Sequence, residues 1–122
     1  MSRLIAAALL TLATVANATD RLPVEEARIE YLLAVVASLH DGQFIRNGTA
    51  YDSTAAVKHM RTKLRLAGSR VKTAEDFIRY CGSESSVSGK PYEIRFPDGQ
   101  VVRSADFLRL KLIEFDQSGG LP

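Results

Sequence analysis

Cysteine is nearly absent from this chain of 122 residues, which contains Cys81 alone. A lone cysteine cannot form a disulfide within the chain, so the stability of the fold must come from an apolar core. Cys81 lies on the apolar stripe of a predicted helix, where we expect a buried small hydrophobe rather than a reactive thiol. His40, His59 and Cys81 are the only soft or borderline metal ligands, and none is paired at a metal-binding spacing. We therefore expect no metal site and no cofactor.

Neither sign of charge is in large excess, since 16 Lys and Arg residues face 14 Asp and Glu residues. Only Arg3 among them lies before residue 19, so the chain from residue 19 onward carries a net charge of +1. Binding by charge alone usually requires a clustered excess of positive residues, whereas basic and acidic residues are interleaved here. The most basic stretch, residues 59–65, is typical of the solvated face of a helix. We expect no nucleic-acid partner.

The first eighteen residues have the layout of a secretory signal peptide. Arg3 provides the positive start, Leu4 to Ala16 is an uncharged run of 13 mostly apolar residues, and Ala16-Asn17-Ala18 offers a small-x-small cleavage site. Thirteen helical residues span only about 20 Å, which is too short for a hydrocarbon core about 30 Å thick. We expect residues 1–18 to be a cleaved signal peptide, with no transmembrane span, and the exported protein to begin at Thr19.

Familiar catalytic motifs fail at defining positions. The segment from Gly82 to Lys90 superficially resembles a phosphate-binding loop, but Glu84 occupies a required glycine position and Pro91 replaces the serine or threonine. The Ser-x-x-Lys motif fails because Val87 stands three residues before Lys90. No recognisable set of nucleophile, base and orienting residue remains.

The patterning predicts a mostly helical α+β fold in a single small domain spanning residues 19–122, with its core at about 24–115. Apolar residues repeat at helical spacing in four segments, and residues 92–102 alternate as a β-hairpin does around the Pro97-Asp98-Gly99 turn. Residues 43–46 are expected to be short and extended or irregular, ending at an Asn47-Gly48 turn. Four helices are predicted. The first covers about residues 24–39, and the second is capped by Asp52 or Ser53 and ends at Gly68. The third is short and is capped by Thr73 with Asp76, and the last is capped by Ser104.

Several polar residues lie near the apolar ones in two loops and on the second helix. If both loops lie over that helix, these side chains converge on one shallow pocket. A purely structural interpretation remains open, in which they satisfy loop carbonyls and cap exposed backbone. The candidate binding residues are Arg46, Asn47, Tyr51, His59, Lys63, Ser85, Ser86, Ser88, Lys90 and Tyr92.

Four short motifs follow one another in a fixed order. They are Phe44-Ile45-Arg46-Asn47-Gly48, then Ala56 with His59 and Lys63, then Thr73-Ala74-Glu75-Asp76-Phe77-Ile78, and finally Ser85-Ser86-Val87-Ser88-Gly89-Lys90-Pro91-Tyr92. With these motifs the chain closely resembles the YfeK-like domain-of-unknown-function family of small exported proteins in Gram-negative bacteria. The resemblance covers residues 24–112 and implies a periplasmic protein. It implies no established activity, so the motif residues are candidates without assigned roles.

Two classes of function follow. The first is a non-catalytic binding or interaction module of the cell envelope, with an envelope protein or a glycan as partner and an open oligomeric state. The alternative is a small hydrolase-like enzyme with His59 as general base and Arg46 or Lys90 stabilising an anion. A remote third hypothesis rests on Ser88-Gly89-Lys90-Pro91-Tyr92, which fits the Ser-Gly-x-x-Tyr pattern by which periplasmic inhibitors of C-type lysozyme insert a loop into the enzyme.

Overall fold

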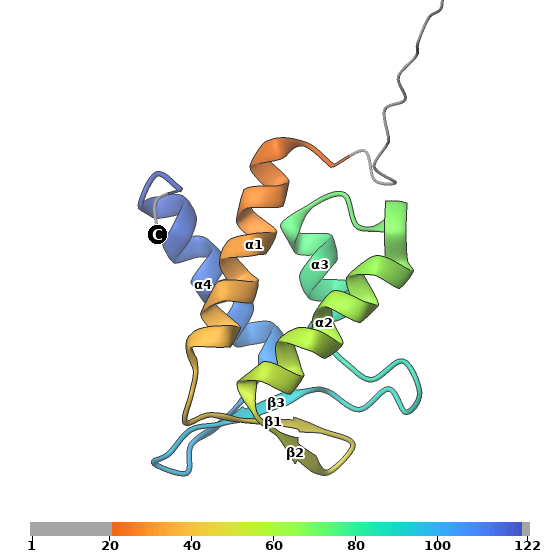
Figure 1. Ribbon diagram of the computed structural model, residues 1–122. Coiled ribbons are helices and arrows are strands. Elements are labelled where there is room, and N and C mark those ends of the chain that lie inside the picture. Colours follow the sequence, from red (N-terminus) through yellow and green to blue (C-terminus); the bar gives the residue numbers. More distant parts are fainter. Residues whose placement is uncertain (1–20, 121–122) are drawn as a thin grey trace, which may run out of the picture.

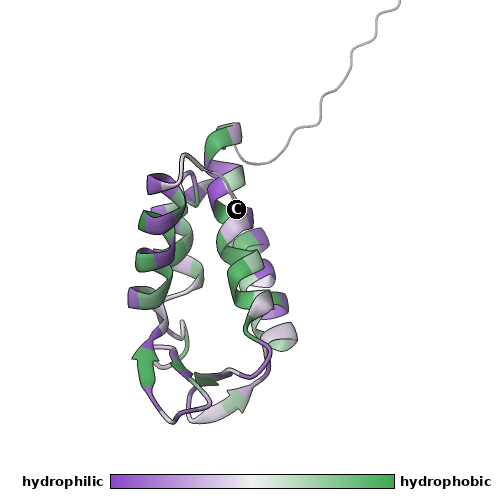
Figure 2. Ribbon diagram, turned by 90° about the vertical axis from the view of Figure 1, so that its left-hand side faces the viewer, coloured by the Kyte–Doolittle hydropathy of each residue, from purple (hydrophilic) through white to green (hydrophobic). Residues whose placement is uncertain are grey.

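Four helices rise from one side of a small antiparallel sheet in the computed structural model, which describes residues 21–120 (Figure 1). Seen from the side in Figure 2, the sheet closes one end of the helical layer, and hydrophilic residues follow the outer edges of the helices. In chain order the elements are α1 (Pro23–Ser38), β1 (Gln43–Arg46), β2 (Thr49–Tyr51), α2 (Ser53–Ala67), the 3-10 turn η1 (Gly68–Arg70), α3 (Ala74–Cys81), β3 (Glu93–Arg95), β4 (Val101–Arg103) and α4 (Ser104–Gln117).

This arrangement confirms the predicted α+β class and the four predicted helices. The predicted signal peptide, residues 1–18, lies outside the described residues. Within residues 21–120, no helix has both the length and the apolar character needed to cross a membrane.

The sheet is larger than the single hairpin that the sequence predicts. Its strand order is β2-β1-β3-β4, and the 43–46 segment, expected to be extended or irregular, is an inner strand. Asn47 and Gly48 both have positive φ, at 52° and 81°, which suits the tight turn that joins β1 to β2. The other edge of β1 pairs with β3, so that Phe44 lies opposite Ile94. This second pairing joins segments about fifty residues apart, and no local pattern reports it.

Helix starts follow the predicted caps in α2 and α3 but not in α4. Asp52 accepts a hydrogen bond from the backbone of Ala55 at 2.8 Å, and Thr73 and Asp76 form a reciprocal capping box. The prediction that Ser104 caps α4 is wrong, because Ser104 is the first helical residue and Arg103 precedes the helix. Strand β4 runs directly into α4, and the Ser104 amide already donates to the carbonyl of Tyr92 at 2.9 Å. The Ser104 hydroxyl is left buried without a partner among the described residues.

The core lies between the helices and the inner face of the sheet. Helix α3 packs against α1, α2 and α4, and its buried face carries the predicted stripe of Phe77, Ile78 and Cys81. Cys81 is fully buried, as expected, and this burial raises the pKa of its thiol to about 11. The thiol is therefore protonated at neutral pH, where a thiolate nucleophile would be scarce.

Candidate functional site

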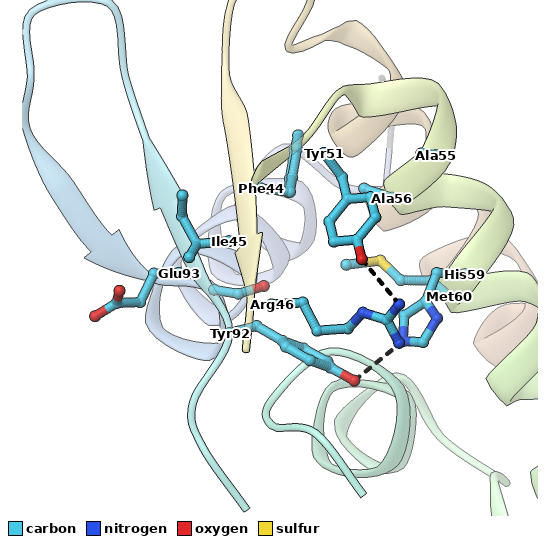
Figure 3. A pocket seen from close by; sticks show the side chains of 11 residues that line it. Phe44, Ile45, Arg46, Tyr51, Ala55, Ala56, His59, Met60, Tyr92 and Glu93 are labelled. Carbon is cyan, nitrogen blue, oxygen red and sulfur yellow. Dashed lines mark hydrogen bonds between the residues drawn. The ribbon is translucent and has the colours of Figure 1, made fainter. Parts of the chain in front are cut away.

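A pocket opens where the inner face of the sheet meets α2 (Figure 3). Its volume is ≈ 120 Å³, and four of the predicted candidate residues line it. They come from four parts of the chain: Arg46 from β1, Tyr51 from β2, His59 from α2, and Tyr92 from the segment just before β3. The remaining lining residues are Phe44, Ile45, Ala55, Ala56, Met60, Glu93 and Ser104.

Strand register places the polar and aromatic groups of the sheet on one face. Phe44 lies opposite Tyr51 in β2 and opposite Ile94 in β3. Since side chains alternate along a strand, Arg46 shares the face of Phe44, and the same register continued past Glu93 brings Tyr92 across from Arg46. Glu93 falls on the other face, and Figure 3 shows its carboxylate directed away from the Arg46 guanidinium.

Helix α2 completes the pocket with one of its faces. Ala56, His59 and Met60 are spaced three and four residues apart, so their side chains point to the same side of the helix. Ala56 and Met60 are buried, whereas His59 is half-buried at the edge of the apolar stripe. The pocket thus has an apolar wall with a polar rim.

The Tyr92 hydroxyl joins two basic side chains of α2. Nζ of Lys63 donates to it at 3.1 Å, and Nε2 of His59 lies 3.0 Å from it. Lysine can only donate, and Nε2 is the one acceptor that the described residues offer to the Tyr92 proton. We therefore assign Tyr92 as the donor to Nε2, which places the proton of neutral His59 on Nδ1.

Arg46 extends across the pocket between Tyr51 and Tyr92 toward the His59 ring (Figure 3). Its Nη2 donates to the Tyr51 hydroxyl at 3.3 Å, and its guanidinium lies 5.1 Å from the centre of the Tyr51 ring. Among residues 21–120, the Arg46 side chain forms no ion pair and donates no other hydrogen bond. Most of its donor capacity is therefore available to a ligand.

The pKa of His59 is lowered below its usual value, first because burial disfavours the charged imidazolium and then because Arg46 and Lys63 are positive. His59 is therefore uncharged at neutral pH. These two cations, from β1 and from α2 itself, also make the local potential positive.

The lowered pKa of His59 predicts a pH dependence of stability. Below about pH 6.5 the unfolded chain binds a proton at His59 that the folded chain binds less well, so acid favours unfolding. We expect the wild-type protein to lose stability relative to His59→Gln as the pH falls from about 7.5 to 5. Urea unfolding of both proteins across this range measures the difference. Parallel stability curves would contradict the assignment of a lowered pKa.

Three of the other candidate residues, Asn47, Ser85 and Ser88, join two loops outside the pocket. Nδ2 of Asn47 donates to the buried Ser85 hydroxyl at 3.2 Å, and the Ser88 hydroxyl donates to Oδ1 of Asn47. The backbone of Ser85 also donates to the carbonyl of Lys90 at 3.0 Å. Asn47, Ser85 and Ser88 therefore have a structural role, because they hold the 83–92 loop against the β1–β2 turn.

A second hollow, of ≈ 550 Å³, lies beyond Tyr92 and is lined by Lys63 and Ser86. Three further arginines line it, Arg79, Arg103 and Arg109, which sequence reasoning did not select. Their positions among acidic residues gave no sign that the fold gathers them.

Within the first pocket, Phe44, Met60 and Ser104 were also missed as site residues. Phe44 was expected only in a short extended or irregular segment, and Met60 follows the apolar pattern of a helix. Ser104 was taken as a helix cap. No signal in the sequence separates a pocket wall from a core contact.

The geometry gives little support to the alternative functions. The imidazole of His59 is hydrogen-bonded to Tyr92, and no serine of the described residues forms a hydrogen bond with it. Tyr92 is 7 % exposed and holds two hydrogen bonds, so it is not free to enter another protein's cleft through the Ser88–Tyr92 loop. Residues 21–120 contain no group of three His, Cys, Asp or Glu side chains that could hold a metal ion.

Comparisons with known proteins agree with the resemblance found in the sequence. A family of unknown function, DUF5329, matches residues 23–116. The uncharacterized protein YfeK of Salmonella typhimurium is 44% identical over 88 residues, which cover 72% of this chain and 71% of that protein. No solved structure matches the chain. The chain therefore belongs to the DUF5329 family.

Proposed function

We propose that this protein is a non-catalytic binding module of the cell envelope and that its binding site is the pocket between α2 and the sheet. The observation that carries the proposal is the convergence of Arg46, Tyr51, His59 and Tyr92 from four separate segments on one pocket. Ligand sites are typically concave, largely apolar and equipped with a few convergent polar groups. This pocket has each of these features.

The apolar part of the pocket can hold a small group, and the polar part can orient it. Phe44, Ala56 and Met60 supply hydrophobic contacts, while Arg46 directs donors inward. The 83–92 loop is bonded to Asn47 through Ser85, and its exposed Val87 offers a surface for a larger partner. A binding module needs no nucleophile, and no serine or cysteine of the described residues is hydrogen-bonded to His59.

The proposal includes a periplasmic address, supported by the signal-peptide pattern of residues 1–18. Cells that express the full chain should release the protein on osmotic shock, and the mass of the released protein should match a chain that begins at Thr19. A chain that stays in the cytoplasm with residues 1–18 attached would contradict the address.

A fragment screen on the released protein tests the binding site. We expect fragments of about ten heavy atoms to bind with dissociation constants on the order of 1 mM and to shift amide NMR signals of residues around the pocket. Backbone amides of Arg46, Tyr51, His59 and Tyr92 serve as reporters. Hits that cluster elsewhere, or an absence of hits at this pocket, would contradict the proposed function.

A further inference from the structure

Two half-buried arginines of this protein, Arg28 and Arg46, differ in whether a carboxylate pairs with them. The half-buried Arg28 on α1 meets three carboxylates, those of Glu25, Glu75 and Asp116, at 2.8 to 3.1 Å. Arg46 is also half-buried, yet no carboxylate of residues 21–120 forms an ion pair with it. A partly desolvated guanidinium without an anion is electrostatically incomplete, because burial weakens its hydration and only the hydroxyl and ring of Tyr51 replace the lost water.

A second unsatisfied group lies in the same pocket. Ser104 is 1% exposed, it lines the pocket, and its hydroxyl has no hydrogen-bond partner among the described residues. Buried hydroxyl groups in native proteins are nearly always hydrogen-bonded. The Ser104 hydroxyl and the remaining N–H groups of Arg46 are thus hydrogen-bond donors on the lining of one pocket.

The rest of the pocket limits the size and polarity of the ligand. A dry cavity of about 150 Å³ is large enough to admit benzene, and this pocket of ≈ 120 Å³ has Phe44, Ala56 and Met60 on its wall. Since it is smaller than that cavity, the pocket can enclose at most one ring or one branched alkyl group. A planar carboxylate matches a single guanidinium with two parallel hydrogen bonds, whereas a doubly charged phosphate needs more donors than these.

We propose that the pocket binds a carboxylate carried on a single aromatic ring or a short branched alkyl group, with Arg46 as its charged partner and Ser104 as a second donor. This inference rests on the proposed function and names the ligand class of the same site. The carboxylate can belong to a free acid or to the last residue of a peptide. Both sources present the same chemistry to Arg46.

Charges around the pocket favour this anion. Lys63 contributes a second positive charge through its contact with Tyr92, and the Glu93 carboxylate points away. Burial is the main cause of the lowered pKa of His59, and the positive charges of Arg46 and Lys63 lower it further; a bound carboxylate would offset these charges. Binding should therefore shift the titration of the His59 imidazole to higher pH, which a neutral ligand would not do.

Benzoate and benzamide form a matched pair of probes, since they have the same shape and differ in charge. We expect benzoate to shift the amide signals around the pocket and to bind about ten-fold more tightly than benzamide. Arg46→Gln should weaken benzoate binding about ten-fold and Ser104→Ala about three-fold, whereas Arg95→Gln should change it less than about two-fold. Arg95 is an exposed arginine on β3 that bonds to Gln43 outside the pocket, so it controls for loss of one positive charge.

The His59 imidazole signals provide an independent readout, with a higher titration midpoint expected in saturating benzoate than in saturating benzamide. Acetyl-Ala-Phe with a free or an amidated carboxyl end distinguishes a peptide terminus from a free acid as the source.

Equal binding of benzoate and benzamide, or no effect of Arg46→Gln, would overturn the ligand class. If other fragments bind in the pocket while benzoate does not, the proposed ligand class is wrong but the proposed binding function is still supported. If no fragment binds in the pocket, both the ligand class and the proposed function are wrong.

Discussion

Replacing Phe77 with alanine should lower the free energy of unfolding by about 3 to 5 kcal/mol, the range expected when a buried aromatic side chain is removed. Phe77 is 0% exposed at the centre of α3, which packs against α1, α2 and α4 at once. Because three helices pack against α3, they can close the resulting cavity only in part. A loss of this size is a large part of the stability of a small domain.

Urea unfolding of the purified protein, followed by circular dichroism, measures this loss. Phe77→Leu keeps most of the buried volume and should cost less than half as much as Phe77→Ala. If Phe77→Ala does not fold, Phe77→Leu still provides a measurable value. A loss below about 1 kcal/mol for the alanine variant would contradict the position of α3 in the core.

The second large effect is expected at Glu25, where a carboxylate of α1 holds the start of α3. Its Oε1 accepts from the Ala74 amide at 2.8 Å and from Nη1 of Arg28 at 2.9 Å. Arg28 in turn bonds Asp116 on α4 and Glu75 on α3, and these carboxylates raise its pKa further above the usual value. Glu25→Ala removes the most buried acid of this cluster and leaves a helix amide without its acceptor. We expect a loss of about 2 kcal/mol.

Glu30→Ala is the matched control on the same helix. Glu30 pairs with Arg61 at 2.8 Å, but both side chains are about half exposed. An exposed ion pair contributes about 0 to 1 kcal/mol, and the change in helix propensity is the same as for Glu25→Ala. Equal losses for the two variants, measured by urea unfolding, would show that the Glu25 cluster does not connect α1 to α3.

Much of the helical part of this fold is readable from local patterns. The capping box of Thr73 and Asp76 and the stripe of Phe77, Ile78 and Cys81 predict α3 closely, because both signals act within one helical turn. The pairing of β1 with β3 was missed because it depends on contacts between distant segments. The cap assigned to Ser104 was wrong because β4 runs directly into α4, so that Ser104 is already the first helical residue. Its amide bonds to the carbonyl of Tyr92, a contact between distant segments that local patterns do not report.

The candidate site was predicted in part for similar reasons. Polar residues in an apolar setting marked Arg46, Tyr51, His59 and Tyr92, which the structure gathers in one pocket. The same reasoning selected Asn47 and the loop serines, whose hydrogen bonds instead join two loops. Residue type alone does not separate these two roles, because each needs short polar side chains near a turn.

The most direct test of the account is to fill the pocket without touching its charges. Ala55 lines the pocket, so Ala55→Leu places a larger apolar side chain there, while Thr54→Leu makes a comparable change at the neighbouring exposed position. Both variants should keep the fold, as circular dichroism will report. We expect Ala55→Leu to weaken the binding of fragment hits by about ten-fold or more and Thr54→Leu to change it less than about two-fold. Equal affinities in wild type and Ala55→Leu would contradict the claim that this pocket is the binding site.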